Sequence, residues 1–361
     1  MRESDPSPRR SELTPAGSPA RGALLALLLS ASASAQSLHV ETLTPLDGMP
    51  GGLVGSMAQT EDGRLWFAAR NQLSSWDGTV WTHLTAGVDL EPEMSAHWIA
   101  ARGMDVVCSG WRLRGGLLLH EEAGGWEELS LETITDEELD LPLGGLEFVG
   151  DDRVVLALGE ELLHIDLETR QWTRIPPPSG AAGEIRQLEL AGDELLLTRG
   201  QSIERLPAGT LELELVHDLT GDRMDPLAIH AAPPGPQGRS RLWVAGRDSL
   251  GYYEDGRLYR LPVTLPGVWQ EDPTLVSLEA DRQGNLFLTT RSTVLLLDGK
   301  TGQIRMLDRE HGLAGLGATS TFSCRDGNVW ICSQRGLTRI PPQRFMSWTA
   351  RNGLPEDEVT A

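Results

Sequence analysis

Short apolar runs recur along the chain, and turns rich in Gly, Asp and Asn separate them. The clearest runs occupy residues 65–69, 242–246, 286–290 and 329–333. Runs of this length between such turns predict β-strands, and pairs such as Asp255-Gly256 predict the hairpins that join them. No copy of the pattern combines a 3.6-residue apolar period with helix caps, so the sequence predicts an all-β chain.

A unit of four strands repeats along the chain. The anchor positions Trp243, Phe287 and Trp330 are 44 and 43 residues apart, a period typical of propeller blades. Seven copies are recognisable, at residues 61–84, 103–129, 150–175, 191–206, 239–261, 282–307 and 325–340. The pattern predicts a seven-bladed β-propeller of four-stranded antiparallel blades over residues 36–348. We expect strands from the two chain ends to close the ring, because an open ring would expose sheet edges.

The first residues are typical of a secretion signal. Basic residues up to Arg21 precede a short apolar run at 23–29, and residues 33–35 read A-x-A, as at a cleavage site. Residues 1–35 are therefore predicted to be a signal peptide, and the mature chain is expected in the periplasm or outside the cell. Residues 349–361 are interpreted as the start of a further repeat, either truncated or a disordered tail.

Composition narrows the choice of partners. The net charge of −21 disfavours nucleic acid, whose binding depends on neutralising phosphates, and it disfavours contact of the propeller with an anionic membrane surface. Three cysteines are too few for a disulfide scaffold. Cys324 and Cys332 flank one hairpin and are expected on opposite faces of the sheet, which argues against a bridge between them.

No catalytic signature stands out, and no pair of histidines has the spacing of metal ligands, so neither catalytic residues nor a metal or cofactor is predicted. Trp66, Trp243 and Trp330 recur at one strand position and are predicted to pack between blades. Trp111 lies outside that register, in a loop between a second and a third strand. It is a candidate for stacking on a sugar or another flat ligand.

Arginine recurs in the loop after the second strand. Six of the seven copies carry it, as Arg70, Arg112, Arg199, Arg247, Arg291 and Arg335. Equivalent propeller loops open on one face around the central channel, so these side chains would form a positive ring. Such a ring suits an anionic small molecule or oligosaccharide, because guanidinium groups pair with carboxylate, sulfate or phosphate. The plainer interpretation, favoured by the many Asp and Glu residues, is ion pairing between blades.

The repeat resembles a known family. The pattern Gly-Leu-Pro, Asp-Gly-x-Leu-Trp, Gly-Leu appears at residues 62–66, at 326–330 with Gly336-Leu337, and at 353–355. It is similar to the two-component regulator propeller repeat of bacterial hybrid signalling proteins. The resemblance implies an extracytoplasmic sensor module whose output domain lies outside this chain, with a homodimer formed through the signalling scaffold. The copies between residues 100 and 206 depart from the consensus.

Two other functions remain open. A secreted enzyme of the streptogramin-lyase-like type would need a metal or a His/Glu constellation on one face, and His97, His217, His230 and His311 are the histidines expected in suitable inter-blade loops. A propeller that acts only as a protein-interaction scaffold would need neither. The composition and motifs favour a binding or sensing module over an enzyme.

Overall fold

The computed structural model describes residues 39–51, 53–69, 72–84, 95–111, 116–121, 125–130, 143–222, 224, 226–232, 241–266, 275–315 and 318–342. The predicted signal peptide and the predicted start of a further repeat lie outside these ranges. One compact unit spans Val40–Pro342. Within the described ranges, no helix has the length and hydropathy needed to cross a membrane.

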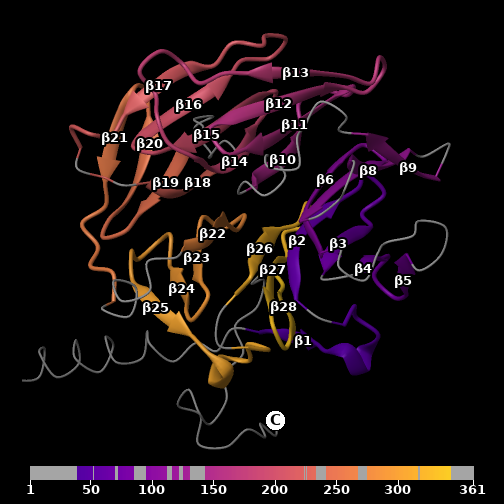
Figure 1. The fold of residues 1–361 in the computed structure, drawn as a ribbon. Coiled ribbons are helices and arrows are strands. Elements are labelled where there is room, and N and C mark those ends of the chain that lie inside the picture. The colour runs from indigo at the N-terminus through magenta and orange to yellow at the C-terminus, as the bar shows by residue number, and fades with distance from the viewer. Residues whose placement is uncertain are drawn as a thin grey trace, which may run out of the picture. The chain divides into compact units, whose positions relative to one another are not determined.

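The described strands form seven four-stranded antiparallel sheets (Figure 1). Three sheets come from the first half of the chain: β2 to β5 (Val54–Gln59, Leu65–Ala69, Gln72–Trp76, Trp81–Leu84), β6 to β9 (Ser95–Arg102, Asp105–Trp111, Gly116–Glu121, Gly125–Ser130) and β10 to β13 (Leu143–Phe148, Arg153–Leu158, Glu161–Asp166, Gln171–Ile175). Three follow: β14 to β17 (Ile185–Ala191, Glu194–Arg199, Ser202–Leu206, Glu214–Asp218), β18 to β21 (Pro226–Ala232, Arg241–Gly246, Leu250–Glu254, Arg257–Arg260) and β22 to β25 (Leu275–Ala280, Leu286–Thr290, Val294–Leu297, Ile304–Leu307). The last sheet joins β1 (Glu41–Leu43) to β26 to β28 (Ser320–Ser323, Val329–Ser333, Gly336–Ile340), and short 3-10 turns occupy Pro45–Asp47 and Arg309–His311.

The sheets are the blades of an all-β propeller. The first strand of each sheet contacts the first strands of two neighbouring sheets, and β26 contacts β2, so the contacts form a closed circuit. The prediction of seven like blades nevertheless needs correction, because six blades are each built from four consecutive strands and the seventh sheet is not. The remaining sheet is a composite, in which β1 pairs with β28 and places Glu41 opposite Arg339. This pairing removes two exposed strand edges.

The Asp-Gly turns form for local reasons. The Asp62 carboxylate accepts a hydrogen bond from the backbone N–H of Arg64, and Gly63 adopts a φ of 89°, which a residue with a Cβ rarely does. Asp255 and Gly256 both have positive φ, as the two central residues of a tight hairpin turn require. The Asp-Gly pairs in the sequence therefore predict these turns because the aspartate carboxylate and the glycine backbone each stabilise the turn directly.

A β-bulge recurs in the innermost strands. The pairing register of the first strand shifts by one residue near its start in six of the seven sheets. A bulge bends a strand and increases its twist. Because it recurs at the same place, it directs the following residues of each first strand in the same way.

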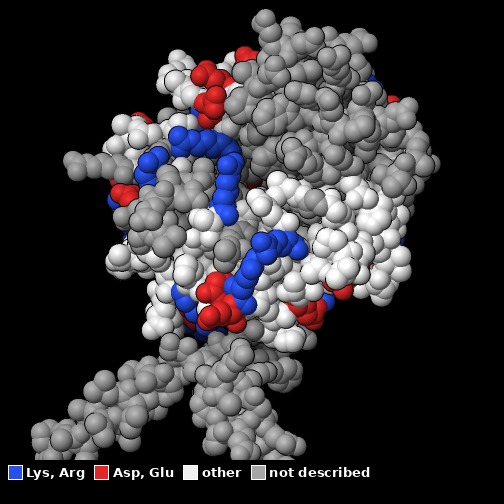
Figure 2. All heavy atoms as spheres, turned by 60° about the horizontal axis from the view of Figure 1, so that its bottom comes forward, with Lys and Arg blue, Asp and Glu red and all other residues white. Residues whose placement is uncertain are grey.

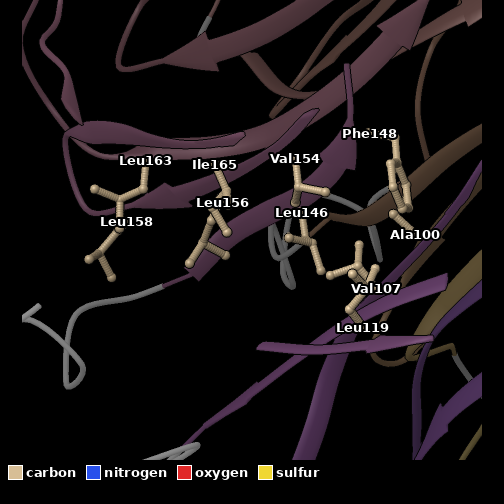
Figure 3. Close-up of a cluster of buried hydrophobic side chains, with 10 residues drawn as sticks. All are labelled: Ala100, Val107, Leu119, Leu146, Phe148, Val154, Leu156, Leu158, Leu163 and Ile165. Atoms are coloured by element: carbon tan, nitrogen blue, oxygen red, sulfur yellow. The ribbon is translucent and has the colours of Figure 1, made fainter. Parts of the chain in front are cut away.

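The core lies between neighbouring blades. One cluster packs Ala100, Val107 and Leu119 of one blade against Leu146 and Phe148 of the next (Figure 3). Trp330 is 1% exposed within another cluster, and Trp66 and Trp243 pack against clusters that join their own blade to the next. The predicted packing role of these anchor tryptophans is confirmed.

The cysteines need one correction. Cys108, Cys324 and Cys332 are all free and buried. The register of β26 with β27 pairs Phe322 with Trp330 and therefore places Cys324 on the same face as Cys332, where both join one core cluster. The expectation of opposite faces is wrong, because the hairpin turn is one residue out of phase with the count from Asp326-Gly327.

Candidate functional site

Three of the predicted arginines occupy equivalent turns. Arg247 and Arg291 directly follow the second strands β19 and β23, Arg335 is the second residue after β27, and all three are exposed. In the part of the chain that the structure describes, their guanidinium groups make no ion pair or hydrogen bond. These turns lie at the same end of the second strands of three successive blades, so the sequence register was correct for them.

Arg199 is different, and its assignment to the ring is corrected. Its side chain is completely buried, and its Nε lies 3.0 and 3.1 Å from the two carboxylate oxygens of Glu204. Its Nη1 also donates to the carbonyl oxygens of Glu160 and Gly183. The guanidinium is therefore a structural tie, but its ion pair lies within one blade and not between blades as the plainer interpretation expected; only its hydrogen bond to the Glu160 carbonyl reaches the neighbouring blade.

The other predicted site residues lie outside the described parts. Arg70 and Arg112 fall in undescribed residues, and only the backbone of Trp111 is described, at the end of β7. On the face seen in Figure 2, runs of basic side chains cross a largely uncharged area, and acidic side chains lie beside parts of them.

A second group of polar residues lines the innermost strands. Four successive first strands carry an ionisable residue opposite the anchor position of the second strand: Glu147 opposite Val155, Glu189 opposite Leu196, His230 opposite Trp243, and Glu279 opposite Phe287. We call these four residues the channel cluster. The common register brings them together from β10, β14, β18 and β22.

His230 lies between two carboxylates. Its Nδ1 is 3.2 Å from Oε1 of Glu189 and 3.8 Å from Oε2 of Glu279. The nearer contact has the distance of an ion pair but not the geometry of a hydrogen bond, and within the described residues neither ring nitrogen has a hydrogen-bond partner. Glu189 also accepts a hydrogen bond from the backbone N–H of Ala231, at 2.8 Å, which fixes it against the neighbouring blade.

The channel cluster holds protons more tightly than separate groups would. Burial raises the pKa of Glu147 to about 8, and the charges of Glu189 and Glu279 add to the effect. Burial also raises the pKa of Glu279 to about 7, against the opposing charge of His230. Burial disfavours the charged imidazole of His230, but Glu279 and Glu189 outweigh it and raise its pKa to about 9. The cluster can therefore store and exchange protons near neutral pH.

The histidines expected in inter-blade loops are placed differently. His230 lies within β18, His217 within β17 and His97 within β6, whereas His311 ends a 3-10 turn. No group of His, Cys, Asp and Glu in the described residues has the arrangement of a metal site. The sequence analysis missed the channel cluster, although a signal was present. Charged residues stand inside otherwise apolar strands at intervals of 42, 41 and 49 residues.

Comparison with known proteins identifies the fold and no family. No protein-family model and no curated protein sequence matches the chain. Among solved structures, it is similar to a streptogramin B lyase, with 15% identity and a TM-score of 0.64 over 84% of this chain and 97% of the lyase. It is also similar to the extracellular domain of a hybrid two-component system from B. thetaiotaomicron, with 14% identity and a TM-score of 0.61 over 84% of this chain and 39% of that domain.

A third similar structure is YCF48 bound to a D1 peptide, with 14% identity and a TM-score of 0.62 over 86% of this chain and all of YCF48. An enzyme, a sensor domain and a peptide-binding protein therefore share this fold at nearly equal similarity. At such identities the likeness supports the propeller architecture, and function must be argued from the site.

Proposed function

We propose that this chain is an exported ligand-binding propeller that serves as the sensor module of a signalling protein, with its output domain elsewhere. The observation that carries the proposal is the set of three exposed arginines, Arg247, Arg291 and Arg335, in equivalent turns of successive blades. The similarity to extracellular domains of two-component systems supports the same class of function.

The chemistry of the three turns favours an anionic ligand. A guanidinium group presents a planar set of donors that matches carboxylate, sulfate and phosphate groups. On a chain with a net charge of −21, three arginines at one strand end that have no acidic partner among the described residues form a local exception. An anionic oligosaccharide or another small polyanion that spans two turns would gain charge-assisted hydrogen bonds from both.

The test uses the double variant Arg247→Ala/Arg291→Ala. An oligogalacturonate and a sulfated disaccharide serve as probes in calorimetric titrations at low and high salt. We expect the wild-type protein to bind one of them, with an affinity that salt weakens. The double variant should lose binding without a change in melting temperature. Arg257→Ala, an exposed arginine near the opposite strand ends, should bind like the wild type. Equal loss in the control, or binding that survives the double change, would refute the proposal.

Export is part of the same proposal and has its own measurement. The basic residues, apolar run and A-x-A sequence at residues 33–35 predict cleavage before Gln36. Mass spectrometry of the protein from its native host should find an N-terminus at or near Gln36. Recovery of cytosolic protein that retains residues 10–35 would contradict export.

The channel cluster favours a second candidate, a secreted propeller enzyme. His230 and the carboxylates of Glu189 and Glu279 form the type of constellation that general acid–base chemistry uses. Once a ligand is found, prolonged incubation with the wild type and with His230→Gln distinguishes the two functions. Nuclear magnetic resonance spectra that show conversion by the wild type alone would support the enzyme. An unchanged ligand supports the sensor.

A further inference from the structure

A cavity of about 390 Å³ lies between the first two blades, β2 to β5 and β6 to β9. Its walls include Trp66 and Trp126, whose rings meet edge to face at 5.7 Å, and the side chain of Met104. Arg64 and Ser75 of the first blade complete the part of the wall near the Asp62-Gly63 turn. The volume lies within the range of small-molecule sites. This wall is at the opposite strand end from the turns that hold Arg247, Arg291 and Arg335.

The cavity has a specific cause in the repeat. The residue on the third strand that lies opposite the anchor position is large in six blades: Leu119, His164, Arg205, Tyr252, Leu296 and Arg339. In the first blade this residue is Ser75, opposite Trp66. Directly opposed residues of antiparallel strands lie on one face of the sheet. Ser75 therefore leaves open the space that a large side chain fills in the other blades.

The fifth blade, β18 to β21, shows what fits such a space. There Tyr252 lies opposite Trp243, and the two rings meet edge to face at 5.4 Å. The guanidinium of Arg241 lies over the Tyr252 ring, 4.5 Å from its centre. The ring of Tyr259, on the next strand, stacks on the Tyr252 ring with 5.1 Å between the ring centres. The phenol ring is thus enclosed by an indole, a guanidinium and a second aromatic ring.

The first blade repeats this arrangement without the two phenol rings. Arg64 and Trp66 correspond to Arg241 and Trp243, because each arginine stands two residues before its anchor tryptophan. Ser75 and Thr82 take the places of Tyr252 and Tyr259, as the strand registers show. Arg64 reaches across the position of the missing ring, with Nη1 3.4 Å from the Ser75 hydroxyl.

Polar groups at one side of the cavity fit a hydroxyl group. The Ser75 and Thr82 hydroxyls lie on the same face of the blade as Trp66, and the Ser75 hydroxyl is 3.4 Å from Nη1 of Arg64. The hydroxyl of Thr82 has no hydrogen-bond partner among the described residues, so it can pair with a ligand hydroxyl. Asp62 and Arg64 lie 3.7 Å apart and balance each other's charge, so the wall favours a neutral ligand. We propose that this cavity is a binding site for a small phenolic compound, whose ring takes the place that Tyr252 fills in the fifth blade.

The probe is p-cresol, which reproduces a tyrosine side chain. Titration of the full chain, followed by tryptophan fluorescence and ligand-observed nuclear magnetic resonance, should show one saturable site. Ser75→Tyr should weaken binding at least about tenfold and raise the melting temperature, because it fills a cavity. Ser75→Leu, which copies Leu296, is the second variant if the tyrosine is not accommodated. Both results are independent of the anion-binding proposal.

The reciprocal variant is the matched control. Tyr252→Ser should lower stability, create a second p-cresol site in the fifth blade, and regain stability when p-cresol is added. 4-Methylcyclohexanol, which is similar in size and not aromatic, should bind at least about fivefold more weakly to the wild type. The proposal is overturned if the wild type shows no saturable p-cresol binding, if Ser75→Tyr binds as tightly as the wild type, or if glucose binds more tightly than p-cresol.

Discussion

Replacing Arg199 by methionine should destabilise the propeller more than any other single arginine change among the described residues. The side chains of Arg199 and Glu204 are both completely buried and lie 3.0 Å apart. Methionine keeps the length and apolar stem of arginine and removes only the charge and the donors. The change therefore leaves Glu204 as a buried carboxylate with one remaining side-chain donor, the hydroxyl of Ser202 at 2.8 Å.

The expected loss follows from the cost of an uncompensated buried charge. Breaking such a pair by removing one partner costs ~3–5 kcal/mol. Two carbonyl oxygens, those of Glu160 and Gly183, also lose a donor, which adds roughly 1 kcal/mol if no water replaces it. The double variant Arg199→Met/Glu204→Leu removes both charges. It should be more stable than either single variant, because apolar groups can replace a buried pair at little net cost.

Equilibrium urea unfolding, followed by circular dichroism, measures the free energy of unfolding for each variant. Arg205→Met is the control in the same blade. Its guanidinium pairs with Glu214 at 2.8 Å but is 42% exposed, so its loss should cost less than ~1 kcal/mol. A loss below 1 kcal/mol for Arg199→Met, or a double variant whose loss equals the sum of the two singles, would show that the pair does not act as argued.

Two more predictions test the channel cluster and the ring closure. Because the pKa values of Glu147, Glu279 and His230 are raised in the folded state, these groups favour the fold at low pH. The contributions of Glu279 and Glu147 should disappear as pH rises from ~4.5 through about 7 and about 8, respectively. The contribution of His230 should disappear as pH rises from ~6.5 through about 9. Thermal unfolding should therefore show that the free energy of unfolding falls from pH 5 to 9. In Glu147→Gln this fall should be smaller, by ~1.4 kcal/mol for each unit by which the pKa of Glu147 is raised in the wild type. A fall of the same size in the variant would contradict this role. A chain that begins at Pro50 and lacks β1 should melt about 5 °C or more below one that begins at His39, because β28 loses its partner strand; equal melting temperatures would show that β1 does not hold the ring closed.

The sequence predicted the blades well because their signals are local. The Asp62-Gly63 turn depends on a carboxylate two residues from the N–H that it accepts, and on one glycine with positive φ. The anchor Trp330 recurs with the blade period, and its burial follows from the contact between blades. The composite blade was harder, because β1 is only three residues long and its partner β28 lies almost 300 residues away in the sequence.

The candidate site was predicted less well because register alone does not give a side chain's partners. Arg199 ends its second strand and aligns with Gly246, one residue before the turn position of Arg247, and it pairs with Glu204 in the interior. The sequence count was one residue out at this blade, and Glu204 supplies the buried partner. Glu189 and Glu279 were missed because a glutamate inside a strand usually faces solvent, and their shared register appears only when the bulged strands are aligned.

The inter-blade cavity occurs where one blade departs from the pattern of the others, and the channel cluster occurs where four blades carry an ionisable residue at a position that is apolar in the other three. Stability of a propeller comes from repeating the same contact between blades, so a position that most blades fill alike is explained by packing. Ser75 gives up that packing beside Trp66, and His230 and Glu279 place ionisable groups on strands where Ala58 and Ala100 hold the same position in other blades. Each departure carries an energetic cost, from lost contacts or from desolvation. In a repeat fold, function is best sought at positions that carry such a cost in some blades and not in others. These positions can be found only by comparing the blades in the register that the structure supplies.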